Sequence, residues 1–218
     1  MRDSSSKVKT ILLGVVSIVV ILASAFWIYR TQFAPNRDLN ENLHEGIGEA
    51  MANATVQLLG NDGEIVLVTM EEGTSTELDV QVNAFKRIIY QSGVKIARTD
   101  TIGSEKSSEY SSGRGMSGRR YLKLVNKYPN VGALVSFVGS PDGEDDELGE
   151  IENTPPKFVA FVRSPKDLPE LFKRKLIHVA ILPRFQFPAP GPENPKTRKE
   201  WFEKYFQVVL NEKAASGD

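Results

Sequence analysis

The chain has 218 residues and no cysteine, which excludes disulfide bonds, cysteine-based zinc sites and cysteine nucleophiles. Its 27 basic side chains nearly balance its 28 acidic ones, and the formal net charge of −1 gives no general electrostatic case for binding nucleic acid. Hydrophobic residues make up 40% of the chain and charged residues 25%, a composition typical of globular proteins.

An apolar segment without charged residues runs from Thr10 to Tyr29. At about 1.5 Å of rise per residue, a helix of this length crosses a hydrocarbon core of about 30 Å, so the segment predicts one transmembrane helix. Lys7 and Lys9 precede it, and Trp27 stands where interfacial aromatic residues are common. We therefore expect residues 1–9 in the cytoplasm, the helix in the inner membrane, and the remaining chain in the periplasm or an equivalent extracytoplasmic space.

The same segment has a second interpretation as a cleaved signal peptide. The tripeptide Ala23-Ser24-Ala25 fits the small-x-small cleavage pattern. Apolar residues continue beyond it through Ile28, which favours a helix that stays in the bilayer. In both interpretations residues 30–41 form a polar tether, residues 42–210 form an exported domain and residues 211–218 form a flexible tail.

Strands and helices alternate along the exported part. The expected strands are rich in apolar and β-branched residues and lie over Ile65–Val68, Val94–Ile102, Ala133–Val138, Phe158–Val162 and Val179–Leu182. The expected helices carry apolar residues at helical spacing through Leu43–Leu58, Leu78–Ile89, Tyr121–Tyr128, Leu168–Leu176 and Trp201–Val209. This order predicts a three-layer α/β sandwich around a mostly parallel, five-stranded sheet with right-handed crossovers.

Helix ends in this pattern are marked by capping residues. Gly60 and Gly93 stand where a helix would stop. The helix starts carry residues suited to the first turn, namely Thr74 with Glu77, Ser164-Pro165 with Asp167, and Thr197 with Glu200. These signals are local and fix where each helix is expected to begin or end.

Two segments have no periodicity. The Ser- and Gly-rich stretch Gly103–Gly118 ends in a G-x-G-x-x-G sequence that opens a helix. No strand precedes that motif and no acidic residue follows about twenty positions later, so we expect a mobile loop and not a dinucleotide site. Residues 142–152 hold seven carboxylates without the spacing of an EF-hand. We expect a solvated acidic loop there, with a calcium site as the weaker alternative.

Four runs together suggest a family. They are AMANATVQLLGNDGEIVLVTM, VNAFKRIIYQSG, YLKLVNKYPNVGALVSFVG and PKFVAFVRSPKDLPELFKRKLIHVAILP. In order and spacing they resemble the second lobe of type I periplasmic sugar-binding proteins and of related repressor ligand-binding domains. The resemblance implies a Rossmann-like lobe. Members of that family hold a small ligand between two lobes, and the exported part has room for one, which implies half of a cleft.

The resemblance singles out two positions for ligand contact. Gln81 stands in the helix after the first strand, where the family usually carries an Arg. Arg163 ends the fourth strand, where the family usually carries an Asp. Both departures concern ligand-binding positions, whereas the framework residues are kept, so the resemblance implies either a lobe reused as a scaffold or a sensor with altered contacts.

Two further groups are candidates for contact with a partner. Arg114, Arg119 and Arg120 cluster at the Gly-rich helix start, where they could attract an anion or an acidic surface. Trp201, Phe202 and Phe206 belong to the wide aromatic stripe of the last expected helix. Packing of that stripe on its own sheet is the simpler interpretation, and a docking surface is the alternative.

The sequence contains no recognisable catalytic arrangement. Its histidines, His44 and His178, lie far apart, and there is no H-E-x-x-H, P-loop or G-x-S-x-G motif. We expect no enzyme, no metal and no cofactor. The favoured function is a single-pass, non-catalytic accessory or structural subunit of an envelope membrane complex, with other membrane proteins as partners. The alternative is a sugar-like ligand-sensing module that completes its cleft by dimerising.

Overall fold

The computed structural model describes residues 14, 16–26, 39–60, 62–102, 110–111, 115–141, 148, 155–162, 166, 168–184, 191 and 193–211. It divides into two units, Met1–Leu39 and Asn40–Asp218. In the first unit residues 14 and 16–26 are helical and exposed. Among the residues described, no helix is both long and apolar enough to span a membrane. The predicted span extends beyond the described residues at both of its ends.

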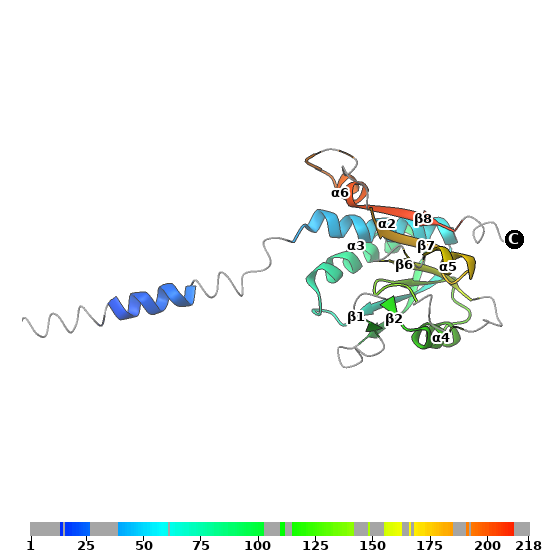
Figure 1. Cartoon of the computed structure of the whole chain (residues 1–218), viewed down its shortest axis with the longest axis horizontal. Coiled ribbons are helices and arrows are strands. Elements are labelled where there is room, and N and C mark those ends of the chain that lie inside the picture. The colour runs from blue at the N-terminus through cyan, green and yellow to red at the C-terminus, as the bar shows by residue number, and fades with distance from the viewer. Residues whose placement is uncertain are drawn as a thin grey trace, which may run out of the picture. The chain divides into compact units, whose positions relative to one another are not determined.

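A six-stranded sheet forms the centre of the second unit (Figure 1). Its strand order is β2-β1-β5-β6-β7-β8. All neighbouring strands are parallel except β7 and β8, which are antiparallel. The strands are β1 (Glu64–Met70), β2 (Lys95–Ile102), β5 (Ala133–Ser136), β6 (Lys157–Phe161), β7 (Val179–Pro183) and β8 (Phe206–Leu210). The predicted mostly parallel α/β sheet is confirmed, and the predicted number of five strands is wrong because β8 adds a sixth.

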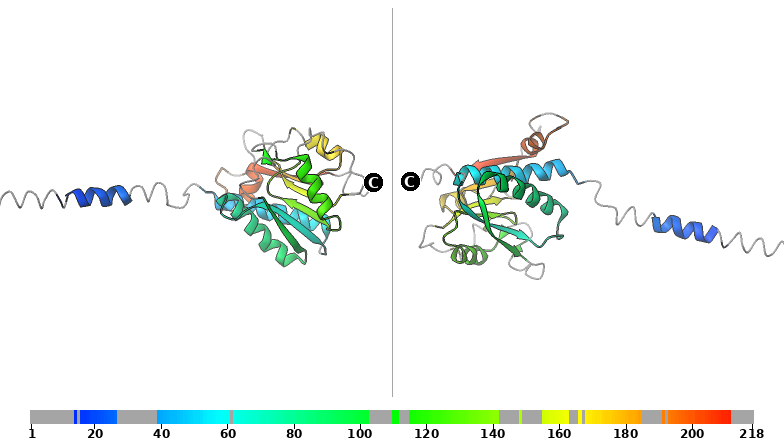
Figure 2. Two further views of the ribbon diagram at one scale, coloured as in Figure 1. Left: turned by 90° about the horizontal axis from the view of Figure 1, so that it is seen from below. Right: turned by 180° about the vertical axis from the view of Figure 1, so that it is seen from behind.

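Helices cover both faces of this sheet (Figure 2). They are α2 (Glu41–Leu59), α3 (Thr76–Ser92), α4 (Gly118–Lys127), α5 (Leu168–Lys173) and α6 (Arg198–Tyr205). On one face α2, α3 and α6 share an apolar cluster in which Phe85 meets Phe137 edge to face. On the other face α4 and α5 share a cluster in which Tyr121 meets Phe158 in the same way. Strands buried on both faces explain why their sequences are continuously apolar.

Two glycines let α2 lie unusually close to its neighbours. A Cβ atom added at Gly46 would lie 2.6 Å from the carbonyl oxygen of Arg198 in α6. One added at Gly48 would overlap the carbonyl oxygen of Gln81 in α3. Any side chain at these positions would force the helices apart. The close approach of α2 and α3 also brings His44 next to Gln81.

The chain changes from helix to strand at Phe206, where the sequence pattern predicts helix as far as Val209. Phe206 has φ −133° and ψ 164°, which is extended backbone. The capping box of Thr197 and Glu200 is confirmed, but the helix it opens ends at Tyr205. Pairing with β7 is the physical reason, because it satisfies the backbone groups of β8 on one side and suits the β-branched Val208 and Val209.

Smaller differences concern caps and loops. Ser75, and not Thr74, caps α3, because its hydroxyl accepts the Leu78 N–H at 3.3 Å. Part of the predicted Gly-rich loop forms a short antiparallel ribbon of β3 (Tyr110–Ser111) and β4 (Gly115–Met116). The predicted helix start at Ser164-Pro165 with Asp167 lies outside the described residues, as does the acidic segment 142–152 apart from Leu148.

Candidate functional site

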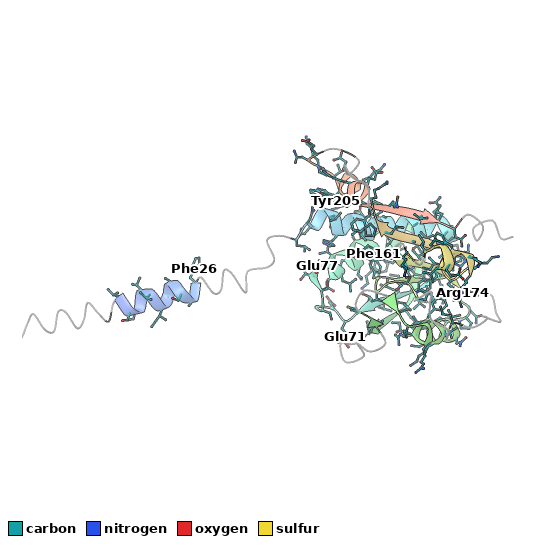
Figure 3. All side chains as sticks on the ribbon, viewed as in Figure 1. Phe26, Glu71, Glu77, Phe161, Arg174 and Tyr205 are labelled. Atoms are coloured by element: carbon teal, nitrogen blue, oxygen red, sulfur yellow. The ribbon has the colours of Figure 1, made fainter. Side chains whose placement is uncertain are left out.

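A pocket of about 90 Å³ opens at the carboxyl end of the parallel strands. Its floor and one wall come from the ends of β1, β5 and β6, and its other wall comes from the first turns of α3. The residues that line it are Met70, Ser75, Glu77, Leu78, Gln81, Phe137, Val138 and Phe161. The side chains of these residues are drawn in Figure 3, where Glu77 and Phe161 are labelled.

The pocket lies where the direction of the chain connections reverses. From β1 the chain passes through α3 to β2 on one side, whereas β5, reached through α4, lies on the other side of β1. The two helices cover opposite faces of the sheet, so the strand ends of β1 and β5 are left uncovered between them. Open α/β sheets bind ligands at this kind of switch point.

The α3 wall of the pocket is polar and carries a negative charge. The Ser75 hydroxyl donates to the Glu77 carboxylate at 2.8 Å. A backbone N–H at the helix start, the Ser75 hydroxyl and the nearby His44 together hold the pKa of Glu77 below its usual value. Glu77 is therefore ionised at neutral pH, and the start of α3 presents oxygen acceptors to the pocket.

Gln81 extends this polar wall and is held by a residue from another helix. Its side-chain Nε2 lies 2.9 Å from Nδ1 of His44 in α2, and Gln81 is only 6% exposed. Burial lowers the pKa of His44, an effect that the charge of Glu77 partly opposes. Neutral His44 accepts the amide N–H at Nδ1, so the imidazole fixes the orientation of the Gln81 amide.

The opposite wall is aromatic and firmly packed. Phe137 is anchored by Phe85, whose ring centroid is 5.4 Å away at 82°. Phe161 leans on Phe206 at 5.8 Å between centroids. No basic side chain lines the pocket among the described residues. The arrangement suits a small molecule that donates hydrogen bonds on one side and offers an apolar surface on the other.

The residues singled out from sequence are spread over the domain. Gln81 lines the pocket, whereas Arg114 and Arg163 lie outside the described residues. Arg119 is exposed on α4, and Arg120 is buried in an ion pair with Asp100 of β2. Neither lines the pocket.

The aromatic candidates occupy α6 and β8. Phe202 is buried in the cluster beneath α2, and Phe206 stacks on it at 6.1 Å between centroids. Phe206 also supports Phe161, so it lies behind the pocket wall. Trp201 is half-buried and stacks on Tyr205 at 5.9 Å. Their role as partner contacts stays a prediction.

Sequence reasoning missed most of the pocket. Ser75 was not singled out, Glu77 and Phe161 were noticed only as parts of a helix and a strand, and His44 only as an isolated histidine. A usable signal existed for the first two, because a Ser followed by a Glu at a helix start after a buried strand points oxygen atoms at the edge of a parallel sheet. No signal linked His44 to Gln81, which is 37 positions away.

No protein-family model and no curated protein sequence matches the chain. Solved structures do resemble it. The glucose-galactose binding protein GanP of Geobacillus stearothermophilus is 10% identical with a TM-score of 0.50, over 77% of this chain and 60% of that one. The XylFII molecule is 15% identical with a TM-score of 0.50 over the same shares. The arabinose binding protein AraP of Geobacillus stearothermophilus is 16% identical with a TM-score of 0.47, over 64% of this chain and 45% of that one.

These likenesses concern the fold. The chain spans about half the length of the solved structures it matches, for example 45% of AraP and 60% of GanP. The expected lobe of the periplasmic binding-protein type is therefore confirmed as an architecture. GanP is named as a binding protein.

Proposed function

We propose that this chain binds a small, polyhydroxylated, sugar-like molecule at the carboxyl edge of its sheet. The observation that carries the proposal is a pocket at the switch point with Glu77 and Gln81 on one wall and Phe137 and Phe161 on the other. A sugar has hydroxyl groups that donate to carboxylate and amide oxygens, and C–H faces that pack on aromatic rings. The shared fold with binding proteins named for glucose, galactose and arabinose supports the same ligand class.

The size of the pocket implies that a second surface takes part. Small-molecule sites generally enclose about 300–1,000 Å³ and bury about 70–90% of the ligand. The 90 Å³ pocket is too small to do so alone. We therefore propose that it is one side of a cleft, closed by a second copy or by a domain of another protein.

We also propose that the N-terminal helix attaches the domain to a membrane, with the domain outside the cytoplasm. The large apolar side chains of residues 16–26 are more than half exposed, from 55% at Val16 to 65% at Ile21. Leaving apolar surface in water costs about 25 cal/mol per Å², so a bilayer or another membrane protein is the favourable environment for this helix. The same exposed helix favours the second candidate function, an accessory subunit of an envelope membrane complex.

Ligand binding is tested by thermal unfolding of the full chain in detergent, with a panel of neutral monosaccharides at millimolar concentration. A ligand at 100 times its dissociation constant adds about 2.7 kcal/mol to the free energy of unfolding, which appears as a raised melting temperature. Gln81→Leu should abolish the shift. Asn83→Leu also replaces a side-chain amide by leucine, but on the exposed side of α3, and this variant should keep the shift in melting temperature. A shift that survives Gln81→Leu contradicts the assignment of the site to this pocket, and no shift with any sugar contradicts binding by this chain without another protein.

A further inference from the structure

The two edges of the sheet are built differently. The β2 edge carries exposed Lys95 and Arg98, and its pairing with β1 is irregular between Ile65 and Val66. Exposed charges and bulges are devices that keep a second strand from adding to an edge. The opposite edge strand, Phe206–Leu210, has no charged residue and pairs with β7 in unbroken register. One edge is therefore protected and the other is not.

The hydrogen bonds of β8 show which of its backbone groups point outwards. The Arg184 N–H donates to the Tyr205 carbonyl at 2.8 Å, and the Asn211 N–H donates to the His178 carbonyl at 2.9 Å. Antiparallel strands bond through alternate residues, so Val208 and Leu210 direct their N–H and C=O groups away from β7. No described residue pairs with these groups.

Phe206 is the third residue of β8 whose backbone groups point away from β7, and both of these groups are hydrogen-bonded within the chain. Its N–H donates to the Phe202 carbonyl at the end of α6. Its carbonyl accepts the Nε–H of Arg184 at 2.9 Å. The part of the edge with unpaired backbone groups is thus confined to Val208 and Leu210. These two residues are 38% and 42% exposed.

We propose that β8 pairs antiparallel with β8 of a second copy of this chain, so that one sheet continues through a two-fold dimer. With the axis at Val209, the N–H and C=O of Val208 bond to those of Leu210 in the second copy, and the reverse pair forms by symmetry. This register satisfies all of the open backbone groups. The strand is complementary to itself because it has no charge to oppose its own copy.

The protected β2 edge limits this association to two copies of the chain. A molecule with two open edges would add copies without limit, whereas one open edge gives a dimer and stops. The proposal does not rest on ligand binding, because the residues that line the pocket come from β1, from β6, from α3 and its cap, and from the segment that follows β5, and none comes from β8. Failure of one proposal therefore leaves the other standing.

The first test uses the natural absence of cysteine in the full chain. The proposed axis places Val209 opposite itself as a non-hydrogen-bonded pair, with Cα atoms about 4.5 Å apart, which is within the range that a disulfide bridges. Mild oxidation of Val209→Cys should give a covalent dimer. The control is Tyr90→Cys, at a site that is 72% exposed on α3. Crosslinking of Val209→Cys no greater than that of the control overturns the proposal.

The second test is sedimentation velocity of the full chain in detergent over a range of concentrations. Val208→Lys and Leu210→Glu should each raise the dimer dissociation constant about tenfold or more, with unchanged circular dichroism. A mixture of the two should dimerise again, because the register places residue 208 opposite residue 210. The proposal is overturned if the natural chain stays monomeric, or if the mixture of the two variants does not dimerise. It is also overturned if neither substitution weakens the dimer, which is the result expected of a dimer held together by the N-terminal helix.

Discussion

His178 connects three strands, and we expect it to make the stability of the domain sensitive to acid. Its backbone N–H donates to the Phe158 carbonyl at 2.8 Å, and its ring Nδ1 accepts the Phe158 N–H at 3.2 Å. Its carbonyl accepts the Asn211 N–H at the end of β8. Burial, together with the positive charges of Lys157 and Lys175, lowers the pKa of His178 to about 4. A protonated ring could not accept the Phe158 N–H, so the fold requires the neutral form.

The direction and size of the effect follow from this pKa. The ordinary value is 6.5, so the unfolded chain takes up the proton first as the pH falls. The stabilisation is complete above pH 6.5 and is lost progressively as the pH falls towards about 4. Between pH 7.5 and pH 5 the difference in proton binding should lower the free energy of unfolding by about 2 kcal/mol.

The measurement is urea unfolding of the full chain at several pH values in this interval, followed by circular dichroism. The comparison protein is His178→Asn, whose side-chain oxygen can take the place of Nδ1 but does not titrate. His44 also has a lowered pKa and contributes in the same direction, but it is present in both proteins. Between pH 7.5 and pH 5 the variant should lose about 2 kcal/mol less than the natural chain. Parallel pH profiles for the two proteins would refute the reasoning.

Three further outcomes are expected. Gly48→Ala should lower the free energy of unfolding by about 1–3 kcal/mol, because its Cβ would overlap a carbonyl oxygen of α3. Gly63→Ala, whose Cβ would meet only the Leu59 side chain at 3.4 Å, should have little effect in the same urea titration. Ser75→Ala should cost about 1 kcal/mol through loss of the α3 cap, and Thr74→Ala much less; equal costs would contradict the cap assignment. N-terminal sequencing of the mature protein should find a start before the apolar segment, whereas a start at Phe26 would exclude the retained anchor.

Local signals in the sequence were sufficient for most of the fold. Gly60 ends α2 and Gly93 ends α3, and both have positive φ. Glycine is favoured at these two positions because residues with a Cβ rarely take that conformation. The capping box of Thr197 and Glu200 begins α6, since each side chain satisfies an N–H at the helix start. Strands buried on both faces were visible as apolar runs. Each of these features depends on residues within a few positions of one another.

The tertiary structure decided what local patterns could not. The segment from Trp201 to Val209 has apolar residues that suit a helix as well as a strand, and pairing with β7 turns its second half into β8. The candidate site depends on the same kind of distant contact. His44 contacts Gln81 because Gly48 lets α2 approach α3. Phe161 at the end of β6 and Glu77 in α3 line one pocket because the strand order places β6 two strands from β1. Contacts between distant segments are determined by the packing of the whole domain. The residues that make them have no regular separation in the sequence, so a sequence pattern does not predict them.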